Sequence, residues 1–225
     1  MFSRLAQLAR PPVAVWPSLE DEIGEYKTYF KGKMLNAGAG LRDLSSLVDG
    51  ELVNQDIPHG LDNGNIHIYS PIHDIPVADG EFDGVICNAV LEHVANPVEV
   101  VREIHRVLRP GGHLYLCVPF LQPEHLDPTD FQRYTKDGLR KLVTDEGFEV
   151  VKLEGVHSVY TTLAWIVESW LQSHDSLSYR LMRLIFYPIL RYKTRTSRTY
   201  VDSIASAYRV LARKAKAEGL SRQVA

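Results

Sequence analysis

The chain has 225 residues, of which 45% are hydrophobic and 24% are charged, and its formal net charge is −3. This length and composition are typical of one globular domain with a full core, so we expect a single domain over residues 1–225. The nearly balanced charge gives no overall attraction to nucleic acid, which we exclude as a partner, or to an anionic membrane.

Cysteine usage and hydropathy indicate an intracellular protein. Cys87 and Cys117 both lie in apolar runs, so we expect free, buried thiols in a reducing compartment. The first fifteen residues contain arginines but no long apolar run that would make a signal peptide. The most apolar segment, 159–171, is too short to cross a bilayer and contains Glu168. We therefore expect a cytoplasmic location.

Helix and strand patterns alternate along the chain. A short polar helix is expected after Ser18, because Asp21 follows three residues later, as in a capping box. Apolar runs then predict five strands, at residues 33–37, 51–55, 65–69, 82–87 and 113–118.

The helix before the fifth strand has the clearest signals. Asn96 can cap its start, and Pro97 suits its first turn. Val101, Ile104 and Leu108 form an apolar stripe, and the sequence Arg-Pro-Gly-Gly that follows is typical of a helix end.

A helix over 135–146 and a sixth strand over 148–153 come next. Residues 158–200 interrupt this alternation and predict two inserted helices, before a last strand at 205–212. Strands that alternate with helices form βαβ units, so we expect an α/β fold whose parallel sheet is covered on both faces.

A glycine loop follows the first strand. Gly38 and Gly40 bring backbone N–H groups up to a ligand, usually at the start of a helix. A dinucleotide-binding loop needs a third glycine three residues later, where this chain has Asp43. The loop therefore favours a nucleoside without a diphosphate.

Polar residues follow several strands, at the sheet edge where parallel α/β folds bind ligands. Asp56 lies eighteen residues after Gly38, close to the spacing of an acid that binds ribose hydroxyls. Residues 70–74, Asn88 and residues 119–125 follow the next three strands. Plainer interpretations stay open, since Asp56 also suits a turn and Asn88 also suits a helix cap.

Four stretches occur together in order: Leu-Asn-Ala-Gly-Ala-Gly (35–40), Asp-Ile-Pro-Val-Ala-Asp-Gly-Glu-Phe-Asp (74–83), Val-Leu-Glu-His-Val (90–94) and Arg-Val-Leu-Arg-Pro-Gly-Gly (106–112). With them the chain resembles the class I S-adenosylmethionine-dependent methyltransferases that act on small molecules. The resemblance implies a Rossmann-like, doubly wound sheet of seven mostly parallel strands, with a helical insertion before the last strand.

The implied organisation is a cofactor-binding core at 18–157, an insertion or lid at 158–200 and the last strand within 204–214. Val-Pro-Phe (118–120), His125 and the stretch Pro-Thr-Asp-Phe-Gln-Arg-Tyr-Thr (128–135) further resemble a subgroup associated with bacterial glycan and natural-product pathways.

The resemblance implies a site for S-adenosyl-L-methionine. Its residues would be Asn36, Ala37, Gly38, Gly40, Asp56, Ile57, Ile72, His73 and Asn88. Asp56 would bind the ribose, Ile57 and Ile72 would enclose the adenine, and His73 would meet its edge. The glycine loop and Asn88 would lie near the methionine part.

Two positions depart from the family pattern. Asn36 stands where the family usually has an acid that braces the loop, and Pro71 stands where many members have an acid that binds the adenine amine. A backbone acceptor or Asp74 would then contact the adenine.

Catalysis by a general base suits a hydroxyl acceptor, and His125 is the candidate by residue type and by its place after the fifth strand. Asp130 is the alternative base or orients His125, while Arg133 and Tyr134 would hold the acceptor. In the plainer interpretation His125 is a loop residue and Asp130 caps a turn. Nine histidines without tight ligand spacing predict no metal site, and Glu92 and His93 are interpreted as structural or near the cofactor.

The insertion contains aromatic residues and then six basic residues without an acid between them, namely Arg180, Arg183, Arg191, Lys193, Arg195 and Arg198. In the plain interpretation its helices pack on the sheet or in a dimer. The sharper hypothesis is a lid that favours a phosphorylated, lipid-linked or membrane-surface substrate.

We therefore expect O-methylation of a sugar, a glycan precursor or another small metabolite, by a monomer or homodimer. The alternatives are C- or N-methylation, a catalytically silent module that binds S-adenosylmethionine, and a nicotinamide-dependent dehydrogenase, which Asp43 disfavours.

Overall fold

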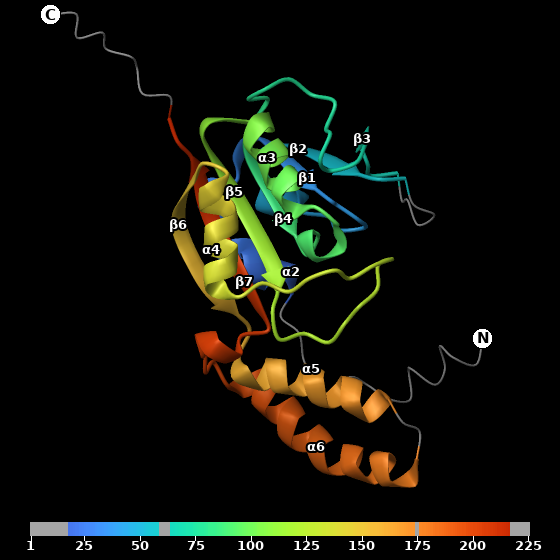
Figure 1. Cartoon of the computed structure of the whole chain (residues 1–225). Coiled ribbons are helices and arrows are strands. Elements are labelled where there is room, and N and C mark those ends of the chain that lie inside the picture. Colours follow the sequence, from blue (N-terminus) through green and yellow to red (C-terminus); the bar gives the residue numbers. More distant parts are fainter. Residues whose placement is uncertain (1–17, 59–63, 174–175, 217–225) are drawn as a thin grey trace, which may run out of the picture.

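The computed structural model describes residues 18–58, 64–173 and 176–216 and shows a seven-stranded sheet with helices on both faces (Figure 1). The strand order is β3-β2-β1-β4-β5-β7-β6. The strands are β1 Lys31–Ala37, β2 Asp49–Asp56, β3 Ile68–Tyr69, β4 Phe82–Asn88, β5 Leu108–Pro119, β6 Phe148–Val156 and β7 Ala207–Lys214. Only β7 runs antiparallel to its neighbours, β5 and β6. The predicted fold class is confirmed.

The side chains of the central strands alternate between two cores. In β1, Met34 packs on one face with Ile86 of β4, while Leu35 packs on the other with Val85. All four are completely buried. Because both faces are covered, these strands have continuous apolar sequences, which makes them predictable from the sequence.

The face of the sheet that contains Leu35 and Val85 is covered by α3 (Pro97–Val107) and α4 (Lys136–Asp145) (Figure 1). The side chain of Asn96 accepts a hydrogen bond from the N–H of Glu99, which confirms the predicted cap. The predicted end of α3 is wrong by one residue. Leu108 has extended backbone angles and pairs with Phe82, so it starts β5, although its side chain stays in the same core.

The opposite face, which contains Met34 and Ile86, is covered by short elements from the N-terminal part of the chain. Helix α2 (Leu19–Ile23) has the predicted capping box between Ser18 and Asp21, and the 3₁₀ helix Gly24–Tyr29 continues it. Their apolar side chains bury Met34 and Tyr115 of the sheet.

The glycine loop does not lead into a helix. All of residues 38–48, between β1 and β2, are described, and they contain only the 3₁₀ turn Ser45–Leu47. The expectation of a helix N-terminus at this loop is therefore wrong.

Several predicted strands have different bounds, and the fifth, expected at 113–118, spans Leu108–Pro119. The third, expected at 65–69, is reduced to Ile68–Tyr69. The last begins at Ala207 rather than 205, because the carbonyls of Ala205 and Ser206 bond to the loop after β5, at Leu121 and Phe120.

The insertion forms a helical hairpin of α5 (Val159–Gln172) and α6 (Leu177–Thr196) that extends away from the sheet (Figure 1). Ala164 and Leu190 are buried between the two helices, and Arg183 pairs with Glu168 at 2.7 Å. Two inserted helices were predicted, and this is confirmed. Across the part of the chain that the structure describes, no helix combines the length and the apolarity that crossing a membrane would require.

Candidate functional site

The glycine loop after β1 makes a close approach to the segment after β4. Gly38 has φ +68° and Gly40 has φ +56°, in the left-handed region that glycine adopts without strain. A Cβ on Gly38 would lie only 2.5 Å from Cγ2 of Val90. Position 38 therefore requires glycine for both its conformation and its space.

Two side chains at the end of β2 hold this loop. The N–H of Gly38 donates to Gln55 Oε1 at 3.2 Å, and the N–H of Gly40 donates to Asp56 Oδ2 at 2.6 Å. The Gln55 amide in turn donates to the carbonyl of Ser70 at 2.6 Å. Gln55 is missing from the predicted site, although a buried amide beside Asp56 at a strand end was a usable signal.

Asn36 has a structural partner. Its side-chain amide donates to Oδ1 of Asn54 at 3.0 Å, and the two residues stand opposite each other in β1 and β2. Asn54 then donates to the carbonyl of Asn65. At the position where the resemblance led us to expect an acid, a chain of amides braces the sheet below the loop.

Asp56 accepts a second hydrogen bond from the N–H of Ile57, at 2.7 Å. Its contact with ribose hydroxyls stays a prediction. Ile57 is 48% exposed beside it, whereas Ile72 packs into the core. The structure thus leaves Ile57 open to a ligand and covers most of Ile72.

The remaining predicted cofactor residues lie at the same sheet edge. Ala37 is buried at the end of β1, and His73 is exposed in the turn that the N–H of Asp74 closes on the carbonyl of Pro71. Asn88 ends β4, half-buried, and its carbonyl accepts a hydrogen bond from the Arg42 guanidinium.

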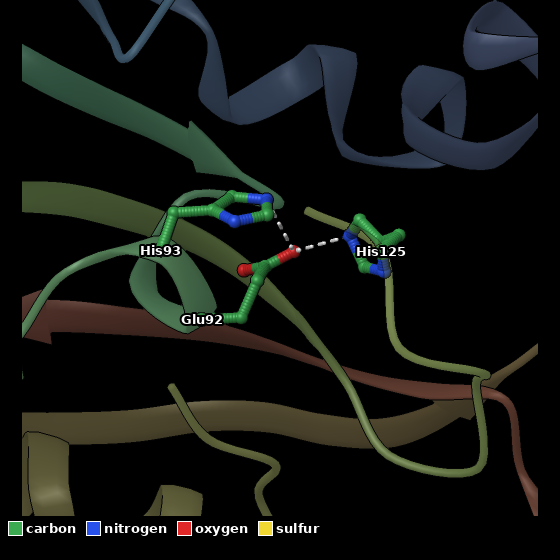
Figure 2. A group of neighbouring side chains, drawn as sticks. All are labelled: Glu92, His93 and His125. Atoms are coloured by element: carbon green, nitrogen blue, oxygen red, sulfur yellow. Dashed lines mark ion pairs between the residues drawn. The ribbon is translucent and has the colours of Figure 1, made fainter. Parts of the chain in front are cut away.

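A cluster of three ionisable side chains lies beyond β4 and β5, formed by Glu92, His93 and His125. Oε1 of Glu92 is 3.7 Å from Nε2 of His93 and 3.6 Å from Nε2 of His125 (Figure 2). Glu92 is completely buried, and neither carboxylate oxygen has a hydrogen-bond partner among the described residues. Burial raises the pKa of Glu92 against the opposing effect of the two imidazoles.

The fold brings these residues together because β4 and β5 are parallel neighbours. The 3₁₀ turn Leu91–His93 follows β4, and His125 lies in the loop after β5. The Gln132 amide fastens this loop to the turn by donating to the carbonyls of Leu91 and Val94. His93 and His125 are therefore close in space although they are far apart in the sequence. The contacts of Gln132 were not predicted.

Asp130 positions His125. Its Oδ2 accepts the backbone N–H of His125 at 2.9 Å and an N–H of Arg133 at 2.5 Å. The Arg133 guanidinium lowers the pKa of Asp130 to about 2, so its carboxylate is a weak base. Asp130 thus fixes the backbone at His125, and both roles predicted for it in catalysis stay predictions.

The two predicted acceptor-binding residues have different surroundings. Arg133 is held within the loop by Asp130 and by the carbonyls of Gln122 and Pro123. The hydroxyl of Tyr134 is buried without a hydrogen-bond partner in the described structure, and burial raises its pKa, with a contribution from Glu92. The contact of both residues with an acceptor stays a prediction.

The helical hairpin leaves the sheet at the same edge as this cluster. Pro119 at the end of β5 pairs with Ala207 of β7, which pairs with Val156 at the end of β6. Just beyond, His157 bridges Glu22 and Ser206 at 2.5 Å each and ties the hairpin to α2. A hollow of about 860 Å³ at this junction is lined by none of the predicted site residues.

Comparisons with known proteins found similarity to methyltransferases. A family model described as a methyltransferase domain matches residues 49–116. The chain is 39% identical over 61 residues to the ubiquinone biosynthesis O-methyltransferase of Pseudomonas aeruginosa, which is 26% of each protein. It is 31% identical over 105 residues to an uncharacterized 37.1 kDa protein in transposon TN4556 of Streptomyces fradiae, which is 40% of this chain and 30% of that protein. The chain thus spans less than a third of the length of these relatives.

Solved structures share the fold. A SAM-dependent methyltransferase from Archaeoglobus fulgidus superposes with a TM-score of 0.57 at 16% identity, over 95% of this chain and 99% of that one. The [4+2]-cyclase SpnF superposes with a TM-score of 0.59 at 17% identity, over 88% and 81%. At these identities the likeness concerns the fold, and the cyclase illustrates that one fold carries different reactions.

Proposed function

Since the chain has the fold and the family segment of a class I S-adenosylmethionine-dependent methyltransferase, we propose that it methylates a hydroxyl of a sugar, a glycan precursor or another small metabolite. The observation that carries this proposal is the convergence of two groups at one sheet edge. The glycine loop with Asp56 lies beyond β1 and β2, and the cluster of Glu92, His93 and His125 lies beyond β4 and β5.

The first group suits S-adenosyl-L-methionine as the cofactor. We place the ribose hydroxyls at the carboxylate of Asp56, because charge-assisted hydrogen bonds of this kind are strong. Gly38 and Gly40 keep the loop free of side chains, so a ligand can approach its backbone. Asn36 braces the sheet below the loop through its hydrogen bond to Asn54.

The second group suits the acceptor. When bound, the cofactor supplies an activated methyl group, and the protein has to place the acceptor oxygen in line with it. A hydroxyl must also lose its proton, and such assistance typically gives 10²–10⁴-fold in rate. Asp130 is a weak base because Arg133 lowers its pKa. We therefore place the loss of the proton at the cluster, where His125 lies beside Glu92. His125 accordingly stays a predicted catalytic residue.

The hairpin supports an acceptor that is presented at a membrane surface. One face of α6 carries apolar side chains that are each more than half exposed, at Leu177, Leu181, Leu184, Ile185, Ile189 and Tyr192. Their spacing of three, four and one residues places them on one stripe of the helix. Residues 176–201 contain basic residues and no acid, so this stripe suits anionic lipid better than a second, equally basic copy. A lipid-linked glycan precursor has both a hydroxyl group as the acceptor and a lipid that holds it at a membrane surface.

A transfer assay tests the proposed reaction. The purified protein is incubated with methyl-labelled S-adenosylmethionine and pools of free sugars, nucleotide sugars and lipid-linked precursors, and the labelled products are identified by mass spectrometry. We expect label in an ether-linked methyl group of one pool. Label in a C-methyl or N-methyl product would overturn O-methylation, and transfer to free sugars alone would overturn the membrane-presented acceptor.

A further inference from the structure

The geometry points to a metal site in this cluster, and we propose that Glu92, His93 and His125 bind one divalent ion of the zinc class. The proposal deepens the proposed function, on which its role toward the acceptor rests. The binding itself stands on the geometry of the three side chains (Figure 2).

The separations suit one shared ion better than hydrogen bonds. The two imidazole nitrogens lie 3.7 Å and 3.6 Å from Glu92 Oε1, beyond the range of about 2.7–3.2 Å for N–H···O bonds. Ligands around a tetrahedral zinc ion, with bonds of about 2.0–2.2 Å, lie about 3.4 Å apart. One ligand atom from each of the three residues lies within 4.8 Å of the others. Small side-chain movements therefore complete the site.

The carboxylate of Glu92 needs a positive partner. A buried carboxylate without hydrogen bonds costs several kcal/mol unless it is protonated, paired or bound to a metal. Arg133 is close enough to act on Glu92 electrostatically, but its guanidinium is already engaged by Asp130. A cation between Glu92 and the histidines supplies the missing charge.

The far sides of both imidazole rings are arranged as in metal sites. Nδ1 of His93 lies 2.6 Å from the carbonyl of Thr129, which can only accept, so Nδ1 carries the proton and Nε2 presents a lone pair to Glu92. Nδ1 of His125 faces the carbonyl of Pro123 at 3.4 Å and Asp130 Oδ2 at 3.7 Å. Metal-bound histidines usually donate their second N–H to such a carbonyl or carboxylate, which fixes the ring.

Three protein ligands leave a position open for the acceptor. A hydroxyl bound there would have its pKa lowered by the cation, as water does on catalytic zinc. Its O–H bond breaks and the proton leaves to solvent through the side of His125, whose side chain is 37% exposed. The oxygen then forms a bond to the methyl carbon, and the electron pair of the breaking C–S bond stays on sulfur. In this account His125 assists proton loss as a ligand.

The test is a direct binding measurement with Zn²⁺ and Co²⁺ as probes. Tag-free protein is stripped with EDTA, dialysed, and titrated by calorimetry with Zn²⁺, while the visible absorption of added Co²⁺ reports the coordination number. We expect one ion per chain and a four-coordinate Co²⁺ spectrum. Glu92→Gln and His93→Ala should each weaken binding at least ten-fold, and His113→Asn, a histidine outside the cluster, should leave it unchanged.

The metal site would be overturned if wild type bound no stoichiometric Zn²⁺. It would also be overturned if Glu92→Gln and His93→Ala bound Zn²⁺ as tightly as wild type. Circular dichroism and calorimetry with S-adenosylmethionine show whether each variant is folded, since neither residue is among those proposed to hold the cofactor. A variant that fails these controls is replaced by His93→Gln. The outcome is separate from the proposed function, because a chain that binds Zn²⁺ but not S-adenosylmethionine would overturn only the latter.

Discussion

The carboxylate of Asp56 accepts the backbone N–H of Gly40 at 2.6 Å, so the acid and the glycine loop form one unit. In the sequence, the glycine loop and Asp56, which lies eighteen residues after Gly38, are two separate signals for a nucleoside site. In the structure the same carboxylate orders the loop, and we propose that it also binds the ribose. Substitutions at Asp56 should therefore affect both the order of the glycine loop and the binding of the ribose.

We predict that Asp56→Ala weakens S-adenosylmethionine binding by about 10–100-fold, because hydrogen bonds to charged groups contribute about 1.5–3 kcal/mol. Asp56→Asn keeps an acceptor for Gly40 but loses the charge, so its affinity should lie between those of Asp56→Ala and wild type. Calorimetry checks both, with Glu51→Gln at the exposed start of β2 as the control. Unchanged affinity in Asp56→Ala would rule out the ribose contact.

Gly38→Ala should destabilise the protein. A non-glycine residue at φ +68° is strained by about 1–3 kcal/mol, and the new Cβ overlaps Val90, which adds a further overpacking cost of similar size. Gly24→Ala is the matched control, since Gly24 has φ −56° and no atom within 4 Å of an added Cβ. Urea unfolding compares the two. Equal stability of both variants would mean that the loop does not need glycine at position 38.

Glu103 gives a pH-dependent contribution to stability. Burial alone would raise its pKa, but hydrogen bonds from Arg106 and from the N–H of Ile75 hold the pKa below its usual value. A carboxyl whose pKa is lowered by folding stabilises above its unfolded value of about 4.3, and this is lost as the pH falls through the folded value.

Glu103→Gln should therefore lower the free energy of unfolding by about 1–3 kcal/mol at neutral pH. The difference from wild type should shrink between about pH 5 and pH 3, as wild type loses its charge. Urea unfolding at several pH values measures it, and Glu99→Gln, exposed in the first turn of α3, controls for loss of a carboxylate. A difference that stays constant over this range would contradict the account.

The exposed stripe of α6 predicts binding to anionic vesicles. Leu184→Ser with Ile185→Ser removes two side chains that are 72% and 61% exposed, so it should lower vesicle association several-fold while leaving the thermal unfolding temperature nearly unchanged. Flotation with phosphatidylglycerol vesicles measures association, and Val151→Ser, 48% exposed on β6, is the control. Equal flotation of the variant and wild type, or a shift of the variant from dimer to monomer in light scattering, would assign the stripe to another role.

Local signals predicted most of the fold. The capping box of Ser18 and Asp21 and the cap at Asn96 are contacts over three residues, so the sequence contains both partners of each. The strands of the sheet centre could be found because burial on both faces makes them apolar throughout. The helix expected after the glycine loop was a wrong prediction. The glycines of the loop were placed correctly, but nothing local distinguishes a helix from the 3₁₀ turn Ser45–Leu47.

The site was predicted only in part because its contacts are long-range. The hydrogen bonds of Gln55 to Gly38 and of Gln132 to the turn after β4 depend on which strands are neighbours, which the sequence does not state. The same is true of His125, which meets Glu92 and His93 only because β5 lies beside β4. Residue type identified His125, and topology supplied its partners.

Calorimetric titration of the purified protein with S-adenosylmethionine, S-adenosylhomocysteine and NAD tests the central claim most directly. We predict that the first two bind with one molecule per chain and that NAD does not, because the loop lacks the third glycine that a diphosphate requires. Binding of NAD without either sulfur nucleoside would contradict the account.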